Sequence, residues 1–205
     1  TTAILCAGLV GFTACDSFLD EDPKSSLTLD TYYKTSADVI GNVNYLYRDG
    51  APDKMGNMTG AYRGSSLSVM NMVTGYFVNE YEGQEVDCSY ARQLTRQDFT
   101  QSCCNYLTND TWKSCYKSIN VANAVIKYVD GVEMDNQAQY KAEARFFRAL
   151  NYFYLVKMFG DVPMVTEPTE DATLVEYPTR TAASEVFNTV IIPDLQFAVE
   201  NLPNA

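Results

Sequence analysis

The sequence predicts a mainly α-helical protein. Three segments place apolar side chains three or four residues apart, the spacing that puts them on one face of an α-helix. A glycine follows each of them, at Gly50, Gly131 and Gly160, where helices commonly end. With 46% hydrophobic and 20% charged residues, the 205-residue chain also has the composition of a globular protein with its own core.

The first helix is expected over residues 31–48, with Asp30 as its N-cap. Residues 51–106 then lose the periodicity and contain five glycines, and an apolar run over 67–78 is the candidate helix among them. So long an irregular stretch in a compact domain commonly carries function. The stripe of the first helix consists of Tyr33, Ala37, Ile40, Asn44 and Tyr47.

Three further helices follow. One begins near Trp112 and ends at Gly131, a longer one is expected over 136–159, and the last is expected over 182–201. Alanines alternate with phenylalanines in the longer helix, which indicates close packing in an antiparallel helical pair. Pro193 is expected to kink or divide the last helix. The two stripes are Trp112, Tyr116, Ile119, Asn123 and Ile126, and then Ala138, Ala142, Phe146, Ala149, Phe153 and Val156.

The N-terminal segment is interpreted as an export signal. Residues 3–14 are apolar and uncharged, and as a helix they would span about 18 Å, against roughly 30 Å for a bilayer core. That length is typical of a secretory signal peptide, so residues 1–14 are read as one that lacks its start; a short buried helix is the alternative. Thr13-Ala14-Cys15 resembles the lipobox of bacterial lipoproteins, although Phe12 replaces the usual leucine. Acyl chains on Cys15 would hold the protein at a membrane, with residues 15–29 as an acidic tether.

The charge and the residue types exclude several functions. Nucleic-acid binding needs a basic surface, whereas this chain has a net charge of −11, so no nucleic-acid partner is expected. The chain has no histidine, which disfavours a zinc site or a histidine base, and no metal or other cofactor is expected. The 15 tyrosines favour polar ligands such as sugars, although tyrosines also commonly lie at the edges of helix packing.

Several blocks resemble the SusD/RagB family of outer-membrane lipoproteins, in the family's order and along nearly the whole chain. The strongest is KAEARFFRALNYFYLVKMFGDVPMV at 141–165. Three others are CDSFLDEDP, similar to the family's start, YYKTSADVIGNVNYLYR, similar to its first helix, and WKSCYKSINVANAVI, similar to the helix before the strongest block. The resemblance implies tetratricopeptide-like helix hairpins with a loop-rich ligand-binding region. Residues 30–205 would be the N-terminal part of this domain, truncated at the C-terminal side, and the last helix would leave an apolar face exposed.

The resemblance also implies a function. Such a protein is non-catalytic, lies lipid-anchored on the exterior of the outer membrane, and hands captured oligosaccharides to a SusC-like TonB-dependent transporter. Two alternatives are a helical scaffold that binds only protein or peptide partners, and a glycoside hydrolase that uses the carboxylates between Glu80 and Asp87. The same carboxylates also fit a calcium ion or a solvated acidic loop.

Candidate ligand-binding residues come from the irregular region and its downstream edge. The resemblance implies that ligand contacts in this half lie in loops just before the helix that begins near Trp112, with no fixed motif. An aromatic face suits the apolar side of a sugar ring, and an amide suits its hydroxyl groups. The candidates are Tyr76, Tyr81, Tyr90, Phe99, Asn105 and Tyr106.

A second group is assigned to the scaffold: Trp112, Tyr116, Asn123, Arg145 and Arg148. The two arginines have no acidic residue four positions away. They therefore either pair with a neighbouring helix or hold a loop, or else lie in solvent.

The cysteines leave two possibilities open. In an exported protein, Cys88 is able to form a disulfide with Cys103 or Cys104. Free thiols, Cys115 among them, are the equal alternative, because the sequence does not give the connectivity.

Overall fold

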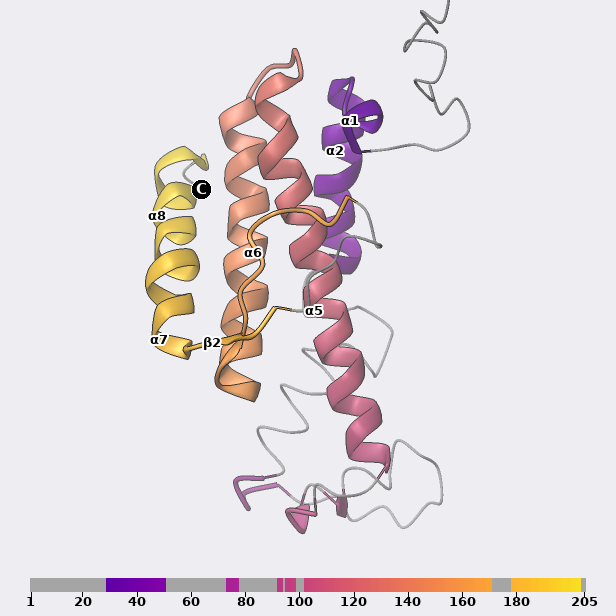
Figure 1. Ribbon diagram of the computed structural model, residues 1–205, viewed down its shortest axis with the longest axis vertical. Coiled ribbons are helices and arrows are strands. Elements are labelled where there is room, and N and C mark those ends of the chain that lie inside the picture. The colour runs from indigo at the N-terminus through magenta and orange to yellow at the C-terminus, as the bar shows by residue number, and fades with distance from the viewer. Residues whose placement is uncertain are drawn as a thin grey trace, which may run out of the picture.

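The protein is described by a computed structural model that covers residues 29–50, 73–77, 92–93, 95–98, 102–170 and 178–203. Within these ranges the helices lie side by side, which confirms the mainly α-helical class (Figure 1). The two longest helices, α5 (Ser102–Tyr128) and α6 (Gln137–Phe159), run antiparallel and are joined through a 3-10 turn at Val129–Gly131. The sequence predicts this helical pair, and α6 begins and ends within one residue of the expected positions. The expected start of the first of the two near Trp112 is wrong, because α5 begins at Ser102, inside the stretch read as irregular.

The prediction of one continuous first helix over residues 31–48 is wrong. The chain forms α1 (Leu29–Tyr32), breaks, and restarts as α2 (Ser36–Tyr45), which ends in a π-helical turn (Leu46–Gly50). Thr35, not Asp30, caps α2: its backbone N–H and its hydroxyl both donate to Asp38 Oδ2, at 2.8 and 2.7 Å. This reciprocal cap fixes the restart of the helix at Ser36.

The stripe expected on the first helix is wrong as well, except at Tyr33. Ala37, Asn44 and Tyr47 are exposed, and Ile40 is half-buried. A second stripe on the same helix carries more apolar surface, and it is this stripe that meets the core. Its members are Val39, Val43 and Leu46.

The core consists of two clusters of buried side chains on either side of α6. One lies between α1–α2 and the α5–α6 pair and includes Val39 and Val125. The other lies between the α5–α6 pair and the helices of residues 183–201 and includes Ile119, Leu155 and Val190. Helix α6 therefore contributes to both clusters and has neighbours on two sides (Figure 1).

The central position of α6 explains an error in the stripe predicted for it. Ala142, Ala149 and Val156 are buried as expected, but Ala138 is exposed, and Phe146 and Phe153 are 38% and 40% exposed. Other faces of the helix bury Phe147, Tyr152 and Leu155 instead. A single stripe describes a helix with one buried face, whereas α6 packs against α5 on one side and α8 on the other.

The last helical run contains the predicted interruption. It consists of α7 (Ala183–Val186), a π-helical turn (Phe187–Ile191) and α8 (Ile192–Asn201), with Pro193 in the first turn of α8. Proline lacks an N–H and its ring crowds the preceding turn, which the wider π-helical turn accommodates. The predicted exposed apolar face is present on α8 at Ile192, Leu195 and Val199.

The link from α6 to α7 carries a small sheet. Strands β1 (Val162–Pro163) and β2 (Arg180–Thr181) pair antiparallel, with Val162 opposite Thr181. The candidate helix over 67–78 is described only at 73–77, which form a turn with Gly75 at a φ of 78°. Among the described helices, none is both long and apolar enough to cross a bilayer. Residues 1–28, with Cys15, and the Glu80–Asp87 cluster lie outside the described residues.

Candidate functional site

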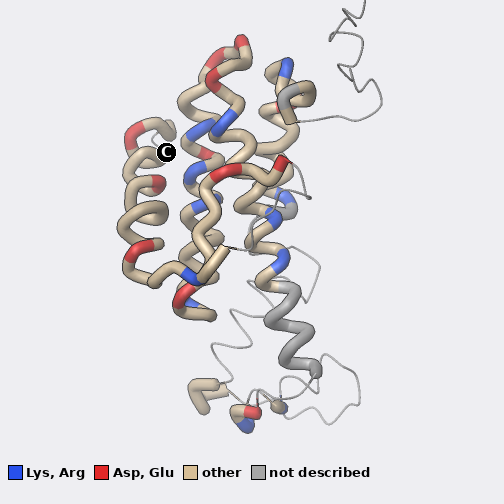
Figure 2. Tube along the Cα trace, viewed as in Figure 1, with Lys and Arg blue, Asp and Glu red and all other residues tan. Residues whose placement is uncertain are grey.

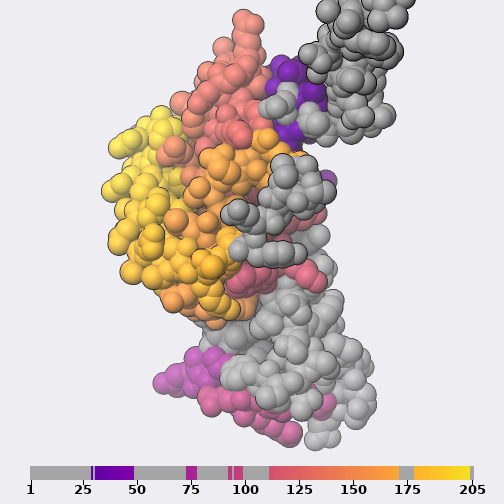
Figure 3. Space-filling model, in the orientation of Figure 1, coloured from indigo at the N-terminus to yellow at the C-terminus, as the bar shows by residue number. Residues whose placement is uncertain are grey.

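An extended segment crosses one face of the helical array. Residues 162–170, here named the strap, leave the end of α6 and cross α6 and α5 toward α1–α2 (Figures 1 and 3). Beyond the two residues of β1, the strap has no strand beside it in the described part of the structure. Its backbone groups therefore need side-chain partners to offset the cost of leaving water.

Side chains of α5 and α6 supply these partners. Tyr152 Oη donates to the carbonyl oxygen of Val165 (2.8 Å) and accepts from its N–H (2.7 Å). Asn123 Nδ2 donates to the carbonyl oxygens of Val165 (3.0 Å) and Glu167 (3.2 Å). Tyr116 Oη donates to the carbonyl oxygen of Pro163 at 2.7 Å. The predicted scaffold residues Tyr116 and Asn123 thus hold the strap.

Arg148 ties the strap to three helices at once. Its Nε and Nη2 donate to the two carboxylate oxygens of Asp194 in α8, at 2.7 and 2.9 Å. Its Nη1 donates to Asn123 Oδ1 in α5 at 2.9 Å and lies 3.5 Å from the carbonyl oxygen of Thr166. The side chains of Arg148 and Asp194 are only 10% and 3% exposed. For Arg148, the structure shows the pairing with a neighbouring helix and not the solvent-exposed alternative.

Arg145 meets α8 in another way. Its guanidinium lies over the ring of Phe197, 4.2 Å from the centroid. Its Nε is 3.8 Å from Asp194 Oδ1, too far for a hydrogen bond but close enough to add positive charge beside that carboxylate. The last of the predicted scaffold residues, Trp112, is half-buried and packs its ring edge-to-face with Phe159 at 5.1 Å.

The far end of the strap is fastened by charged and polar groups. The Thr169 N–H donates to Asn120 Oδ1 at 2.7 Å. Glu170 accepts from Lys127 Nζ (2.5 Å) and Tyr128 Oη (2.6 Å), and the Lys127 hydrogen bond is the main cause that lowers the pKa of Glu170. Basic residues lie mostly along α5 and α6, and acidic residues lie on the strap, on α7–α8 and at the connection between α5 and α6 (Figure 2). Charge therefore complements the hydrogen bonds that hold the strap.

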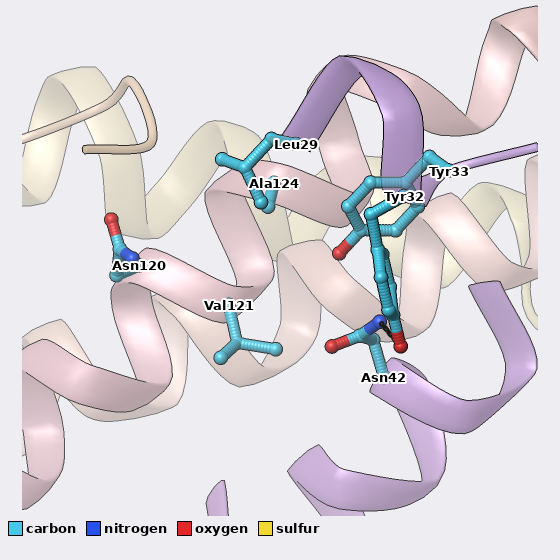
Figure 4. A pocket seen from close by; sticks show the side chains of 7 residues that line it. All are labelled: Leu29, Tyr32, Tyr33, Asn42, Asn120, Val121 and Ala124. Carbon is cyan, nitrogen blue, oxygen red and sulfur yellow. Dashed lines mark hydrogen bonds between the residues drawn. The ribbon is translucent and has the colours of Figure 1, made fainter. Parts of the chain in front are cut away.

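A pocket of about 210 Å³ opens between α1–α2 and α5 (Figure 4). Asn42 Nδ2 donates to Tyr32 Oη across it, at 3.2 Å. The ring of Tyr33 stacks on Tyr128, with centroids 5.4 Å apart and planes within 10°. The lining residues are Leu29, Tyr32, Tyr33, Asn42, Asn120, Val121 and Ala124. Sequence reasoning missed this pocket, because it joins residues about 80–90 positions apart that share no motif.

Of the predicted ligand-binding residues, only Tyr76 has a described side chain. Tyr76 is 89% exposed in the turn at 73–77, near the Ser102 end of α5 (Figure 1). Gln97 Nε2 donates to the carbonyl oxygen of Val73 at 3.4 Å, linking this turn to residues 92–98. Asn105 and Tyr106 belong to α5, but their side chains lie outside the described part. Also outside it are Tyr81, Tyr90 and Phe99, the side chains of Cys103 and Cys104, and Cys88.

Two observations bear on chemistry at the helices. Cys115 is a free thiol, fully buried in the core, and burial raises its pKa to about 12. A thiol with so high a pKa is unreactive at neutral pH. In the described part, no three cysteine, aspartate or glutamate side chains come close enough to share a metal ion.

Comparison with known proteins identifies the family that this architecture belongs to. A SusD-like family model, described as "Starch-binding associating with outer membrane", matches residues 17–205. The chain belongs to this SusD-like family. The match covers the α5–α6 pair, the strap and α8, the elements that the Arg148 network joins.

Relatives of this SusD-like chain share its helical array. SusD-like protein P2 of Formosa agariphila is 28% identical over 206 residues, which are 100% of this chain and 38% of the relative. A SusD superfamily protein of Parabacteroides distasonis superposes with a TM-score of 0.60 at 25% identity, over 80% of this chain and 33% of that one. A crystal structure with xylogluco-oligosaccharide superposes with a TM-score of 0.55 at 21% identity, over 80% of this chain and 30% of that one. The chain thus spans about a third of the length of the proteins it matches.

Proposed function

We propose that the protein is a non-catalytic glycan-binding protein of the outer membrane, which captures oligosaccharides and passes them to a SusC-like TonB-dependent transporter. The family match over residues 17–205 carries this proposal. It gains support from a structural neighbour that was crystallised with xylogluco-oligosaccharide. The exposed rings of Tyr76 and Phe77 provide aromatic surface of the kind that stacks on sugar rings.

The helical array contributes a rigid base to this function. Helices α2 and α5 pack together, and residues 51–101 connect the turn at Leu46–Gly50 to the start of α5 at Ser102. The ligand candidates Tyr76, Tyr81, Tyr90 and Phe99 all fall in that interval. A binding segment that continues into a helix at each end loses less conformational freedom when it binds a ligand.

The two buried carboxylates among the described residues give the hydrolase alternative no support. A glycosidase needs two carboxyl groups that face the same bond, roughly 5 to 9.5 Å apart. Asp194 is buried against Arg148, and the buried Glu143 accepts from Gln139 Nε2 at 3.1 Å. Both therefore serve the scaffold. Release of reducing sugar that disappears in a Glu80→Gln, Glu82→Gln double variant would instead favour cleavage.

The scaffold alternative meets an obstacle in the strap. Arrays of paired helices bind extended peptides on a concave face. Here the strap lies across α5 and α6 and takes the hydrogen bonds of Asn123 and Tyr152. The strap thus occupies surface of α5 and α6 that a peptide would need in order to bind on this face.

The test of glycan binding is affinity electrophoresis and calorimetry of the full-length protein against a panel of polysaccharides that includes xyloglucan and starch. We expect retention by at least one glycan, with a dissociation constant in the micromolar to millimolar range, and no release of reducing sugar. Retention of none of them, together with co-purification of a transporter barrel, would contradict glycan capture and favour the scaffold alternative.

The membrane anchor has a separate test at Cys15. Acyl chains contribute about 0.8 kcal/mol per buried methylene, so a lipidated cysteine holds a protein at a membrane without a spanning helix. We expect Cys15→Ala in the complete precursor to move the protein from the membrane fraction to the soluble fraction. Cys115→Ala, which removes a buried thiol, is the matched control and should leave the protein in the membrane fraction. Membrane retention of the Cys15→Ala variant would contradict lipidation.

A further inference from the structure

We propose that the pocket between α1–α2 and α5 binds a single neutral pyranose residue. This inference rests on the proposed function and adds a subsite away from the exposed Tyr76. The turn that carries Tyr76 lies near the Ser102 end of α5, whereas the pocket faces Asn120 and Ala124, further along the same helix. Two separate regions of the protein would then contact the same class of ligand.

The lining matches the chemistry of a sugar ring. Leu29, Val121 and Ala124 provide apolar surface, and Tyr32 and Tyr33 provide rings for the C–H face of a pyranose. Among the described residues, no side chain that lines the pocket is charged. A carboxylate or phosphate would therefore lose its water there without an opposite charge to offset the cost, which favours a neutral ligand.

The polar groups provide both a donor and an acceptor. Asn42 uses Nδ2 to donate to Tyr32 Oη and to the carbonyl oxygen of Asp38, at 3.2 and 2.9 Å, which leaves its Oδ1 to accept from a ligand. Figure 4 shows Nδ2 turned toward Tyr32 and the Asn42 oxygen turned toward the Val121 side. Asn120 uses Oδ1 to accept from Thr169, which leaves Nδ2 to donate. The Tyr32 hydroxyl accepts from Asn42 and keeps its own hydrogen for a ligand. Sugar hydroxyls need this mixture because each both donates and accepts.

The walls of the pocket are held in place before any ligand arrives. Tyr33 is buried and stacked on Tyr128, and Tyr128 is held by Glu170 of the strap. Asn120 is held by Thr169 of the strap. A preformed site avoids the entropy of ordering its side chains on binding. The strap therefore fixes the pocket as well as the helices.

The volume restricts the ligand to one ring. Pockets for drug-sized ligands measure roughly 300–1,000 Å³, and this pocket measures about 210 Å³. A single sugar ring that makes few hydrogen bonds is expected to bind with a dissociation constant of about 1 mM or weaker. The pocket would add to the affinity for a longer glycan and would not set that affinity alone.

The test uses the full-length protein with isotope-labelled valine methyl groups and NMR titration. The probes are the methyl glycosides of glucose, galactose and xylose, with glucuronate as the charged analogue. We expect at least one neutral probe to shift the Val121 methyl signals saturably, and glucuronate to leave them unchanged. Val199, which is 81% exposed on α8, is the control valine and should not shift.

Variants on α2 locate the effect. Asn42→Leu removes the acceptor at nearly constant volume and should weaken the Val121 response at least fivefold. Asn44→Leu places the same side chain at an exposed position of the same helix and should not change the response. Because the titration of the unsubstituted protein is decisive by itself, the proposal stays testable if Asn42→Leu does not fold.

The outcomes separate this inference from the proposed function. If xyloglucan oligosaccharides bind in calorimetry but no probe shifts Val121, the pocket proposal is wrong and the proposed function stands. If no polysaccharide binds but a neutral probe shifts Val121, the proposed function fails and the pocket stands. An equal shift with glucuronate would overturn the claim that the pocket selects neutral sugars.

Discussion

Arg148→Met is expected to lower the free energy of unfolding of the full-length protein by about 3–5 kcal/mol, because it leaves the buried carboxylate of Asp194 without its bidentate partner. Arg145 lies too far from Asp194 to replace those hydrogen bonds, although its charge places the loss toward the lower end of this range. The same change also removes the bond to Asn123 that orients the amide beneath the strap. The measurement is urea unfolding monitored by circular dichroism. The unfolding transition that shifts in the variant is assigned to the part of the protein that contains the Arg148–Asp194 pair.

Two controls make this result specific. Removing both charges, in Arg148→Met with Asp194→Leu, should restore most of the lost stability, because no unpaired charge then remains buried. Lys127→Met breaks a salt bridge with Glu170 at the exposed end of the strap and should change the transition little. If Arg148→Met costs less than about 1 kcal/mol, the pair does not organise the array as argued.

Tyr152→Phe is expected to destabilise the protein by about 1–3 kcal/mol, because it leaves the N–H of Val165 without its hydrogen-bond acceptor. The carbonyl oxygen of Val165 keeps its bond from Asn123, and the phenylalanine ring still fills the core. The loss should therefore be confined to the strap. Hydrogen exchange of the Val165 amide is the direct measurement, and it should become faster in this variant relative to the core amides of α6.

Tyr116→Phe is the matched control for this prediction. It removes a tyrosine hydroxyl that bonds to the same strap, but the strap group that loses its hydrogen bond is the carbonyl oxygen of Pro163. The exchange of the Val165 amide should then stay close to that of the unsubstituted protein. Equal acceleration in both variants would mean that the strap detaches as a whole, and the assignment of Tyr152 as its main attachment would be wrong.

Local features of the fold could be predicted from the sequence, since they depend on neighbouring residues. The end of α6 follows from Gly160, which has a φ of 69°, and the interruption before α8 follows from Pro193. The first helix was wrong because the Thr35–Asp38 cap lies inside a stretch whose periodicity continues across it. The stripe of α6 was partly wrong because helices pack on both of its sides, which makes several faces apolar.

The candidate site depends on contacts that no local pattern records. Arg148 and Asp194 are 46 positions apart. The hydroxyl of Tyr152 bonds to backbone groups of a strap residue 13 positions later. Backbone partners carry no side-chain signature, so the sequence offers no motif for the strap. One weak indication of the Arg148 contact was present in the sequence. An arginine in a long helix without an acidic residue four positions away either pairs with a more distant group or lies in solvent. The pocket needs α1–α2 and α5 in place before it exists at all.

The Arg148–Asp194 pair also has a consequence for the order in which the chain matures on the ribosome. Domains form from the N-terminal side as synthesis proceeds at about 5–20 residues per second. The α5–α6 hairpin and the strap emerge first. At that stage the guanidinium of Arg148 is solvated, because its partner carboxylate lies 46 residues further along the chain. Burial of that charge therefore becomes favourable only when α8 has been made. Synthesis of α8 thus completes this charge pair, and a nascent chain that stalls before Asp194 is expected to remain open here and accessible to proteases.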